Sequence, residues 1–367
     1  MLIDCGILKG TPGGGESLKN AIKNVVEVTG GKLDVLVVTH EHWDHVSGFL
    51  QAQEEFKQLT IGEVWLAWTE QRGNKLADRL RSQKDKAKKA VADASLKLRK
   101  LLGTDKQAAA SLGALEKLGL FYSDQDQASL GLTAVAQVAT PPATAGEAAP
   151  ESSSSSYSTA SAMDWTRLKT GGQVRYLFPG GETIPIPGLE DVRVFVLGPP
   201  QNESWLKNDS PSKKEPEVYS LASGHDLGFL AALEKRGGVD GMRPFNPSFE
   251  LKGKTAKREA FFQQTYFMEA DLWRQIELDW LWTAERLALQ LDSDTNNTSL
   301  VLAIELVSDG KVLLFPGDAQ VGNWLSWQEL EWTVRNPHGE LEKVKAEGLL
   351  KQTVLYKVGH HASHNAT

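Results

Sequence analysis

The sequence contains one cysteine, Cys5, among 367 residues, and this excludes a fold held together by internal disulfide bonds. A chain so poor in cysteine suits a reducing compartment, so we expect a cytoplasmic protein. The sequence also lacks an uninterrupted apolar run of the roughly 18 residues that a membrane span requires. Its first residues have neither the basic start nor the apolar stretch of a signal peptide. We therefore predict no membrane segment in this chain.

An excess of basic charge is missing too. The formal net charge is −7, which argues against a globally basic nucleic-acid-binding protein. Residues 71–100 are a local exception, because they hold eleven Lys or Arg and three Asp, a balance of +8. Their composition predicts a long exposed helix. Its basic side chains either form a solvated face or follow the phosphate backbone of a nucleic acid.

Short apolar, β-branched runs predict strands near both ends of the sequence. They span residues 33–38, 173–177, 192–197, 299–306, 311–315 and 353–358. Asp309-Gly310 predicts a hairpin turn between two of them. Helical spacing of apolar residues predicts further helices over residues 17–29 and 107–120, and one beginning near Val46. Residues 139–162 are rich in Ala, Pro, Thr and Ser, a composition typical of a linker.

This distribution of strands predicts a β-rich core with large helical insertions. The predicted core comprises residues 1–53, 173–202 and 291–367, and the predicted insertions are residues 54–172 and 203–290. The first residues read as a strand end that enters a turn at once, and the last residues stop within a loop rich in histidine. These features predict that the chain is a fragment of a longer protein.

The densest cluster of chemically active side chains is His40-Glu41-His42-Trp43-Asp44-His45, directly after the predicted strand 33–38. Imidazole nitrogens and carboxylate oxygens are ligands that suit zinc, manganese or iron. A loop at the end of a buried strand is also where binding residues are commonly placed, because the strand holds the backbone still. We therefore predict a metal site in this loop.

The run resembles the H-x-H-x-D-H signature of the metallo-β-lactamase superfamily. The resemblance implies an α+β fold, a four-layer αββα sandwich, here with a large, mainly helical insertion. It also implies two divalent metal ions, with zinc as the first choice and manganese or iron as alternatives. Carried over, His40 and His42 bind the first metal, and Asp44 and His45 bind the second. Asp44 would also act in catalysis by orienting the attacking hydroxide or accepting its proton.

The same resemblance requires ligands from the other end of the sequence. Asp318, after the strand 311–315, is the candidate for the carboxylate that bridges the two metals. His360 is the preferred final histidine ligand, with His361 as the alternative. The family's third histidine is missing from its usual place, and His225 is a possible substitute. Asp4 would hold a histidine ligand in position from behind.

A narrower resemblance links residues 296–302 and 313–319 to the hydrolase domains of competence DNA-uptake (ComEC-like) proteins. Those domains carry an N-x-x-S-[LV]-V-L strand, a G-D-A loop and then H-H-G-S, whereas this sequence has Ala362 in place of the last glycine. The expected substrate-binding residues are Asn297, Ser299, His361 and His364.

Three functions remain open from the sequence. The first is hydrolysis of a phosphodiester, in a small molecule or a nucleic acid, by a hydroxide that bridges two metals. The second is hydrolysis of an ester, thioester or lactam by the same fold. The third is a non-catalytic scaffold whose insertion binds a protein and whose metal site is vestigial. The complete histidine-rich motif favours an enzyme over a scaffold.

Overall fold

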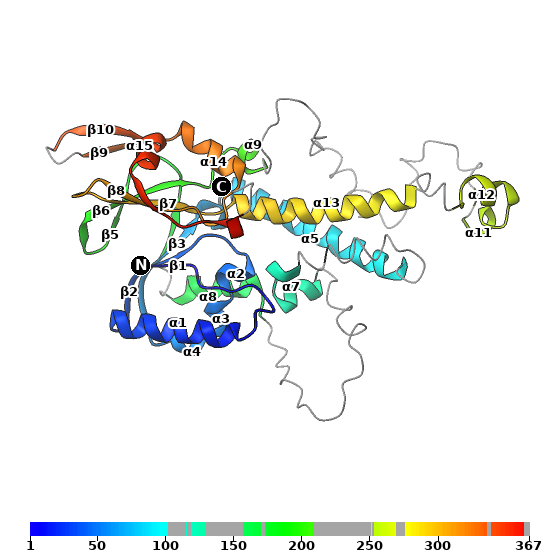
Figure 1. Ribbon diagram of the computed structural model, residues 1–367, viewed down its shortest axis with the longest axis horizontal. Helices are drawn as coiled ribbons and strands as arrows, with labels where there is room; N and C mark the ends of the chain where they lie inside the picture. The colour runs from blue at the N-terminus through cyan, green and yellow to red at the C-terminus, as the bar shows by residue number, and fades with distance from the viewer. Residues whose placement is uncertain are drawn as a thin grey trace, which may run out of the picture.

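Two β-sheets pack face to face, and helices cover the outer face of each sheet (Figure 1). The computed structural model describes residues 1–101, 115, 119–129, 157–169, 173–207, 251, 253–268, 276–335 and 339–362. Three buried clusters separate the layers: one between the two sheets and one on the outer side of each. The predicted four-layer αββα arrangement is therefore confirmed.

The first sheet is parallel throughout, with strands in sequence order. Its strands are β1 (Leu2–Ile3), β2 (Lys32–Val38), β3 (Thr60–Ala67) and β4 (Val174–Leu177). Successive side chains of a strand point to opposite faces. In β2, Val35 and Val37 accordingly face the second sheet, and Leu36 and Val38 face the helices. Both faces are buried, which explains the nearly unbroken apolar sequence of this strand.

The second sheet has the strand order β11-β8-β7-β6-β5. Its strands are β5 (Ile184–Ile186), β6 (Leu189–Gly198), β7 (Val301–Leu306), β8 (Lys311–Phe315) and β11 (Thr353–Tyr356). Only β8 and β11 pair in parallel, and the other neighbours are antiparallel. The predicted hairpin joins β7 to β8. Gly310 takes a φ of 62° there, a conformation that glycine adopts at little cost.

Helices and a short hairpin cover the outer faces of the two sheets. On the first sheet these are α1 (Gly14–Thr29), α2 (Trp43–Val46), α3 (Gly48–Gln51), α4 (Gln53–Phe56) and α8 (Thr159–Lys169). On the second they are α14 (Val321–Ser326), η7 (Trp327–Glu329), α15 (Ala346–Lys351) and the hairpin of β9 (Glu331–Arg335) and β10 (Leu341–Lys345). The fully buried Trp327 and Trp332 anchor this second group against the sheet.

Two long helices, α5 (Lys75–Leu101) and α13 (Ile276–Asn297), run side by side away from the sandwich (Figure 1). The helix predicted over residues 71–100 is confirmed by α5. The remaining elements are η1 (Trp68–Glu70), η2 (Gly119–Phe121), α7 (Asp124–Ser129), α9 (Glu203–Leu206), α11 (Gly253–Ala256), α12 (Ala260–Thr265) and η8 (His360–Ala362). Within the described residues, no helix is both long enough and apolar enough to cross a membrane.

One predicted boundary needs correction. β3 lies inside the segment 54–172 that the sequence assigned to an insertion, yet it is the third strand of the first sheet. Gly62 and Glu63 interrupt its apolar pattern, which hid the strand. Most of the predicted helix 107–120 and most of the linker 139–162 lie outside the described residues, as do His225 and His364.

Candidate metal centre

The candidate site lies at one edge of the sandwich, where the carboxyl ends of several strands meet. Asp4 follows β1, the loop from Thr39 to His45 follows β2, and Asp318 comes three residues after β8. The backbone N–H of Leu300 donates to the carbonyl of Thr39 at 2.9 Å and joins the two sheets at this edge. Segments from both ends of the sequence are thereby brought together.

Asp318 stands at the middle of the site. Its carboxylate belongs to two groups whose potential ligand atoms lie within 4.8 Å of one another. The first group is His40, His45 and Asp318, and all three residues are buried. The second is Asp44, Asp318 and His361. The Nε2 atom of His45 lies 3.3 Å from Oδ2 of Asp318. A carboxylate shared between two donor groups is the arrangement that a bridging ligand needs.

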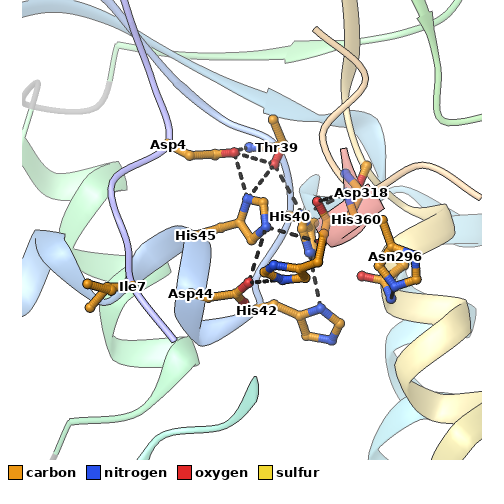
Figure 2. A network of polar contacts seen from close by, with 12 residues as sticks. Asp4, Ile7, Thr39, His40, His42, Asp44, His45, Asn296, Asp318 and His360 are labelled. Atoms are coloured by element: carbon orange, nitrogen blue, oxygen red, sulfur yellow. Dashed lines mark hydrogen bonds and ion pairs between the residues drawn. The ribbon is translucent and has the colours of Figure 1, made fainter. Parts of the chain in front are cut away.

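Two histidines present Nε2 to this centre because their other ring nitrogen is held elsewhere. Nδ1 of His45 lies 2.8 Å from Oδ2 of Asp4, and Figure 2 shows His45 between Asp4 and Asp44. Asp4 is held in turn by Thr39, whose N–H and hydroxyl donate to its two oxygens at 2.7 and 2.6 Å. Nδ1 of His40 lies 3.1 Å from Oγ1 of Thr39 and 3.3 Å from Oγ of Ser299. The contact of Asp4 with His45 suits the holding role inferred from the sequence.

The segment after β11 makes a tight left-handed turn. His360, His361 and Ala362 have φ values of 44°, 51° and 59°, which L-residues rarely adopt in succession. The N–H of His360 donates to Oδ1 of Asp318 at 2.9 Å and helps to hold the turn. As a result Nε2 of His361 reaches Oδ2 of Asp44 at 2.9 Å.

The side chain of His360 points elsewhere. Its Nε2 lies 3.1 Å from Nδ2 of Asn296 on α13, and the two side chains lie side by side in Figure 2. The sequence preferred His360 as the final ligand, with His361 as the alternative. The geometry reverses this order, because the turn aims the imidazole of His361 at Asp44 and ties His360 to Asp318 through its backbone.

Asn297 and Ser299 do not fit the predicted substrate-binding role. Both are 0% exposed, so a substrate arriving from solvent does not reach them. Oδ1 of Asn297 accepts the N–H of Gln320 at 3.1 Å, and its amide donates to the carbonyl of Leu206. Oγ of Ser299 accepts the N–H of Asp318 at 3.1 Å. These side chains fasten the loop that carries Asp318 to the end of α13.

Burial and mutual charge set the protonation of the site. Burial lowers the pKa of His40 well below its ordinary value, and the neighbouring imidazoles His45 and His42 lower it further. Burial also acts to lower the pKa of His45, but Asp318 and Asp4 outweigh it and hold that pKa well above the ordinary value. Burial would raise the pKa of Asp318, yet His45 keeps it well below the ordinary range. The site therefore pairs carboxylates with imidazoles at neutral pH.

The basic helix α5 contacts the histidine-rich loop through Glu41. Lys84 forms an ion pair with Glu41, the residue between His40 and His42, and Nζ of Lys88 lies 3.5 Å from the same carboxylate. Other basic side chains are also paired, Arg72 just before the helix with Asp164, and Arg79 and Arg81 in its first turns with Glu203 and Asp78. These pairs weaken the interpretation of this part of α5 as a track for phosphates.

The donor set fits divalent cations. The residues offer imidazole nitrogens and carboxylate oxygens without any thiolate, which suits zinc, manganese or iron. Oδ1 of Asp44 is buried and has no hydrogen-bond partner among the described residues. A buried carboxylate oxygen without a partner is costly unless a cation lies against it. His40, Asp44, His45, Asp318 and His361 are therefore the candidates to hold metal, and His42 adjoins them through its contact of 3.1 Å with His40.

Residues 1–91 match the family model of the metallo-beta-lactamase superfamily. This chain has a metallo-β-lactamase fold. The matched segment includes the whole histidine-rich loop and ends well before Asp318 and His361. Comparison with curated proteins and comparison with solved structures each found no match. Within this metallo-β-lactamase fold, the family match therefore does not extend to the candidate ligands in the second half of the chain.

Four residues near the loop were not found from the sequence. Phe121 and Tyr122 contact the ring of His42, with ring centroids 5.9 and 6.0 Å away. Asp292 and Asn296 reach the site from α13. Asp292 and Asn296 are four residues apart at the end of a helix, and Asn296 is itself the first residue of the N-x-x-S motif, so this spacing is a signal that could have revealed Asp292.

Proposed function

We propose that the protein is a hydrolase that uses two divalent metal ions, with zinc as the first choice. The observation that carries this proposal is the position of Asp318, shared by the two donor groups at the end of β2 and β8. His40 and His42 would hold one ion. Asp44 and His45 would hold the other; this division follows the family resemblance, whereas the distances between donor atoms also place His45 beside His40. The geometry adds His361 beside Asp44 and Asp318 beside both sets.

When bound, such ions supply a nucleophile near neutral pH and stabilise the negative charge that develops on the substrate. Asp44 would orient the attacking water and accept its proton at Oδ1, the oxygen that has no hydrogen-bond partner among the described residues. His361 holds the other oxygen of Asp44 at 2.9 Å. Because its side chain is 54% exposed, His361 also marks the side from which a substrate would enter.

For the substrate we propose a phosphodiester. The support is the resemblance of residues 296–302 and of Gly317-Asp318-Ala319 to competence DNA-uptake hydrolases. A further support is Phe121, whose ring centroid lies 5.9 Å from those of both His42 and His361. An aromatic face beside the metal ligands can stack on a nucleobase.

A substrate panel tests this proposal. Zinc- and manganese-loaded protein would be assayed with bis-p-nitrophenyl phosphate, a lactone and a cephalosporin. We expect turnover of the phosphodiester, reduced about 100-fold or more in Asp44→Ala, as for loss of a general base. Asp309→Ala removes a carboxylate at an exposed turn and serves as the matched control. Turnover of the lactone or the cephalosporin alone would overturn the proposal of a phosphodiester substrate. The absence of turnover with every compound would overturn the proposal that the protein is an enzyme.

A further inference from the structure

The end of α13 presents two polar side chains to the histidine-rich loop. Asp292 and Asn296 are four residues apart and therefore lie on the same face of the helix. The side chain of Asp292 is 14% exposed, and Asn296 is 1% exposed. Nδ2 of Asn296 lies 3.3 Å from Oδ2 of Asp292 and holds the carboxylate in place.

The other oxygen of Asp292 faces His42. Oδ1 of Asp292 lies 3.4 Å from Nε2 of His42. Both atoms are buried, and neither has a well-formed hydrogen bond to another described residue. The rings of Phe121 and Tyr122 also pack around His42. In such surroundings the proton on His42 has a strong preference for the nitrogen that faces the carboxylate.

The opposite nitrogen of His42 points into the site. Its Nδ1 lies 3.1 Å from Nε2 of His40, so these two atoms converge as two ligands of one ion would. In His45 and His40 the two ring nitrogens have the opposite roles, with Nε2 toward the centre. Nδ1 of His45 is held by Asp4, and Nδ1 of His40 is held by Thr39 and Ser299. Each imidazole has one nitrogen toward the centre and the other fixed by a neighbour.

We propose that Asp292 is a positioning residue that keeps the proton of His42 on Nε2 and so leaves Nδ1 free to bind metal. This inference rests on the proposed metal centre. It gives α13, which lies outside the segment matched by the family, a direct part in the site. Residues that hold a histidine ligand from behind commonly raise metal affinity 10- to 100-fold.

A direct bond from Asp292 to metal fits the geometry less well. It would place an ion on the side of His42 that faces α13, away from His40 and Asp318. The contact of 3.1 Å between the ring nitrogens of His40 and His42 argues for the other side.

The test is zinc binding by the purified chain, measured by competition with a chromophoric chelator. Asp292→Ala should weaken the binding of one zinc equivalent about 10- to 100-fold. Asp292→Asn should stay within a few-fold of wild type, because an amide oxygen can face Nε2 of His42 where Oδ1 of Asp292 does. Asp294→Ala removes a neighbouring acid on α13 that bonds Gln290, and it should bind as wild type does. Unchanged affinity in Asp292→Ala, or the loss of a whole zinc equivalent in Asp292→Asn, would overturn the inference.

A spectroscopic measurement separates positioning from general stability. Long-range ¹H–¹⁵N NMR of the imidazoles should show the proton of His42 on Nε2 in wild type and in Asp292→Asn, and a mixture of tautomers in Asp292→Ala. A proton on Nδ1 in wild type would refute the inference. If wild type binds no zinc, the proposed function fails; if wild type binds zinc and Asp292→Ala binds it equally, only the role of Asp292 fails.

Discussion

Asn297→Ala separates a structural role from a role in substrate binding. The side chain is fully buried where α13, α9 and the loop after β8 meet. Removing this side chain leaves the N–H of Gln320 and the carbonyl of Leu206 without their hydrogen-bond partners, each now 3.1 Å away. A longer contact of 3.4 Å between Oδ1 of Asn297 and the N–H of Asn323 is also lost. An unsatisfied buried group costs about 1–3 kcal/mol, so we expect a total loss of about 3 kcal/mol.

Thermal and urea unfolding measure this loss. At about 2–4 °C per kcal/mol for a domain of this size, the melting temperature should fall by about 6–12 °C. Asn202→Ala is the control, because it removes an exposed asparagine that caps α9 and should cost only about 1 kcal/mol. Unchanged stability of Asn297→Ala, together with a raised KM, would refute this reasoning and restore the substrate-binding role.

Three further predictions concern the loop and its supports. Burial, aided by the adjacent carboxylate, raises the pKa of Cys5 to about 12, so the thiol should resist alkylation at pH 8 until the protein is unfolded; rapid labelling of native protein would contradict this. Burial acts to raise the pKa of Glu41, but the paired Lys84 and its neighbour lower it, so Glu41→Gln should lose about 1–3 kcal/mol at pH 7. This stabilisation is present above the unfolded carboxyl pKa of about 4.3 and is lost as the pH falls below it, so urea unfolding should show a smaller difference from wild type in acid. Finally, a Cβ at Gly6 would lie 2.3 Å from the backbone of the histidine-rich loop, so Gly6→Ala should lower both the melting temperature and the zinc affinity. Gly348→Ala is the control, because its Cβ would meet no atom within 4 Å and should lower neither quantity.

The sequence predicted the parts of the site that depend on local order. The loop from His40 to His45 gathers its ligands within six positions at the end of an apolar strand, so no long-range information is needed to recognise it. Asp318 was predicted differently, because the family resemblance requires a distant Asp and the Gly-Asp pair after a clear strand supplies one. The layers of the fold could be predicted because the strands at the two ends of the chain have strong apolar patterns.

Residues that depend on packing could not be found in this way. The choice between His360 and His361 is made by a left-handed turn, which the apolar and polar pattern does not encode. Asp292 acquires its role only when α13 packs beside α5 and brings its last turns to His42. The burial of Ser299 and Asn297 likewise follows from the meeting of the two sheets, which the sequence motif alone does not reveal.

The most direct test is the metal content of the purified protein, measured by plasma mass spectrometry after dialysis against zinc, for wild type and for Asp318→Ala. If the two metal ions share Asp318 as a ligand, wild type should retain about two zinc ions per chain. The Asp318→Ala variant should retain less than one. Wild type without zinc, or Asp318→Ala with a full complement, would contradict the account.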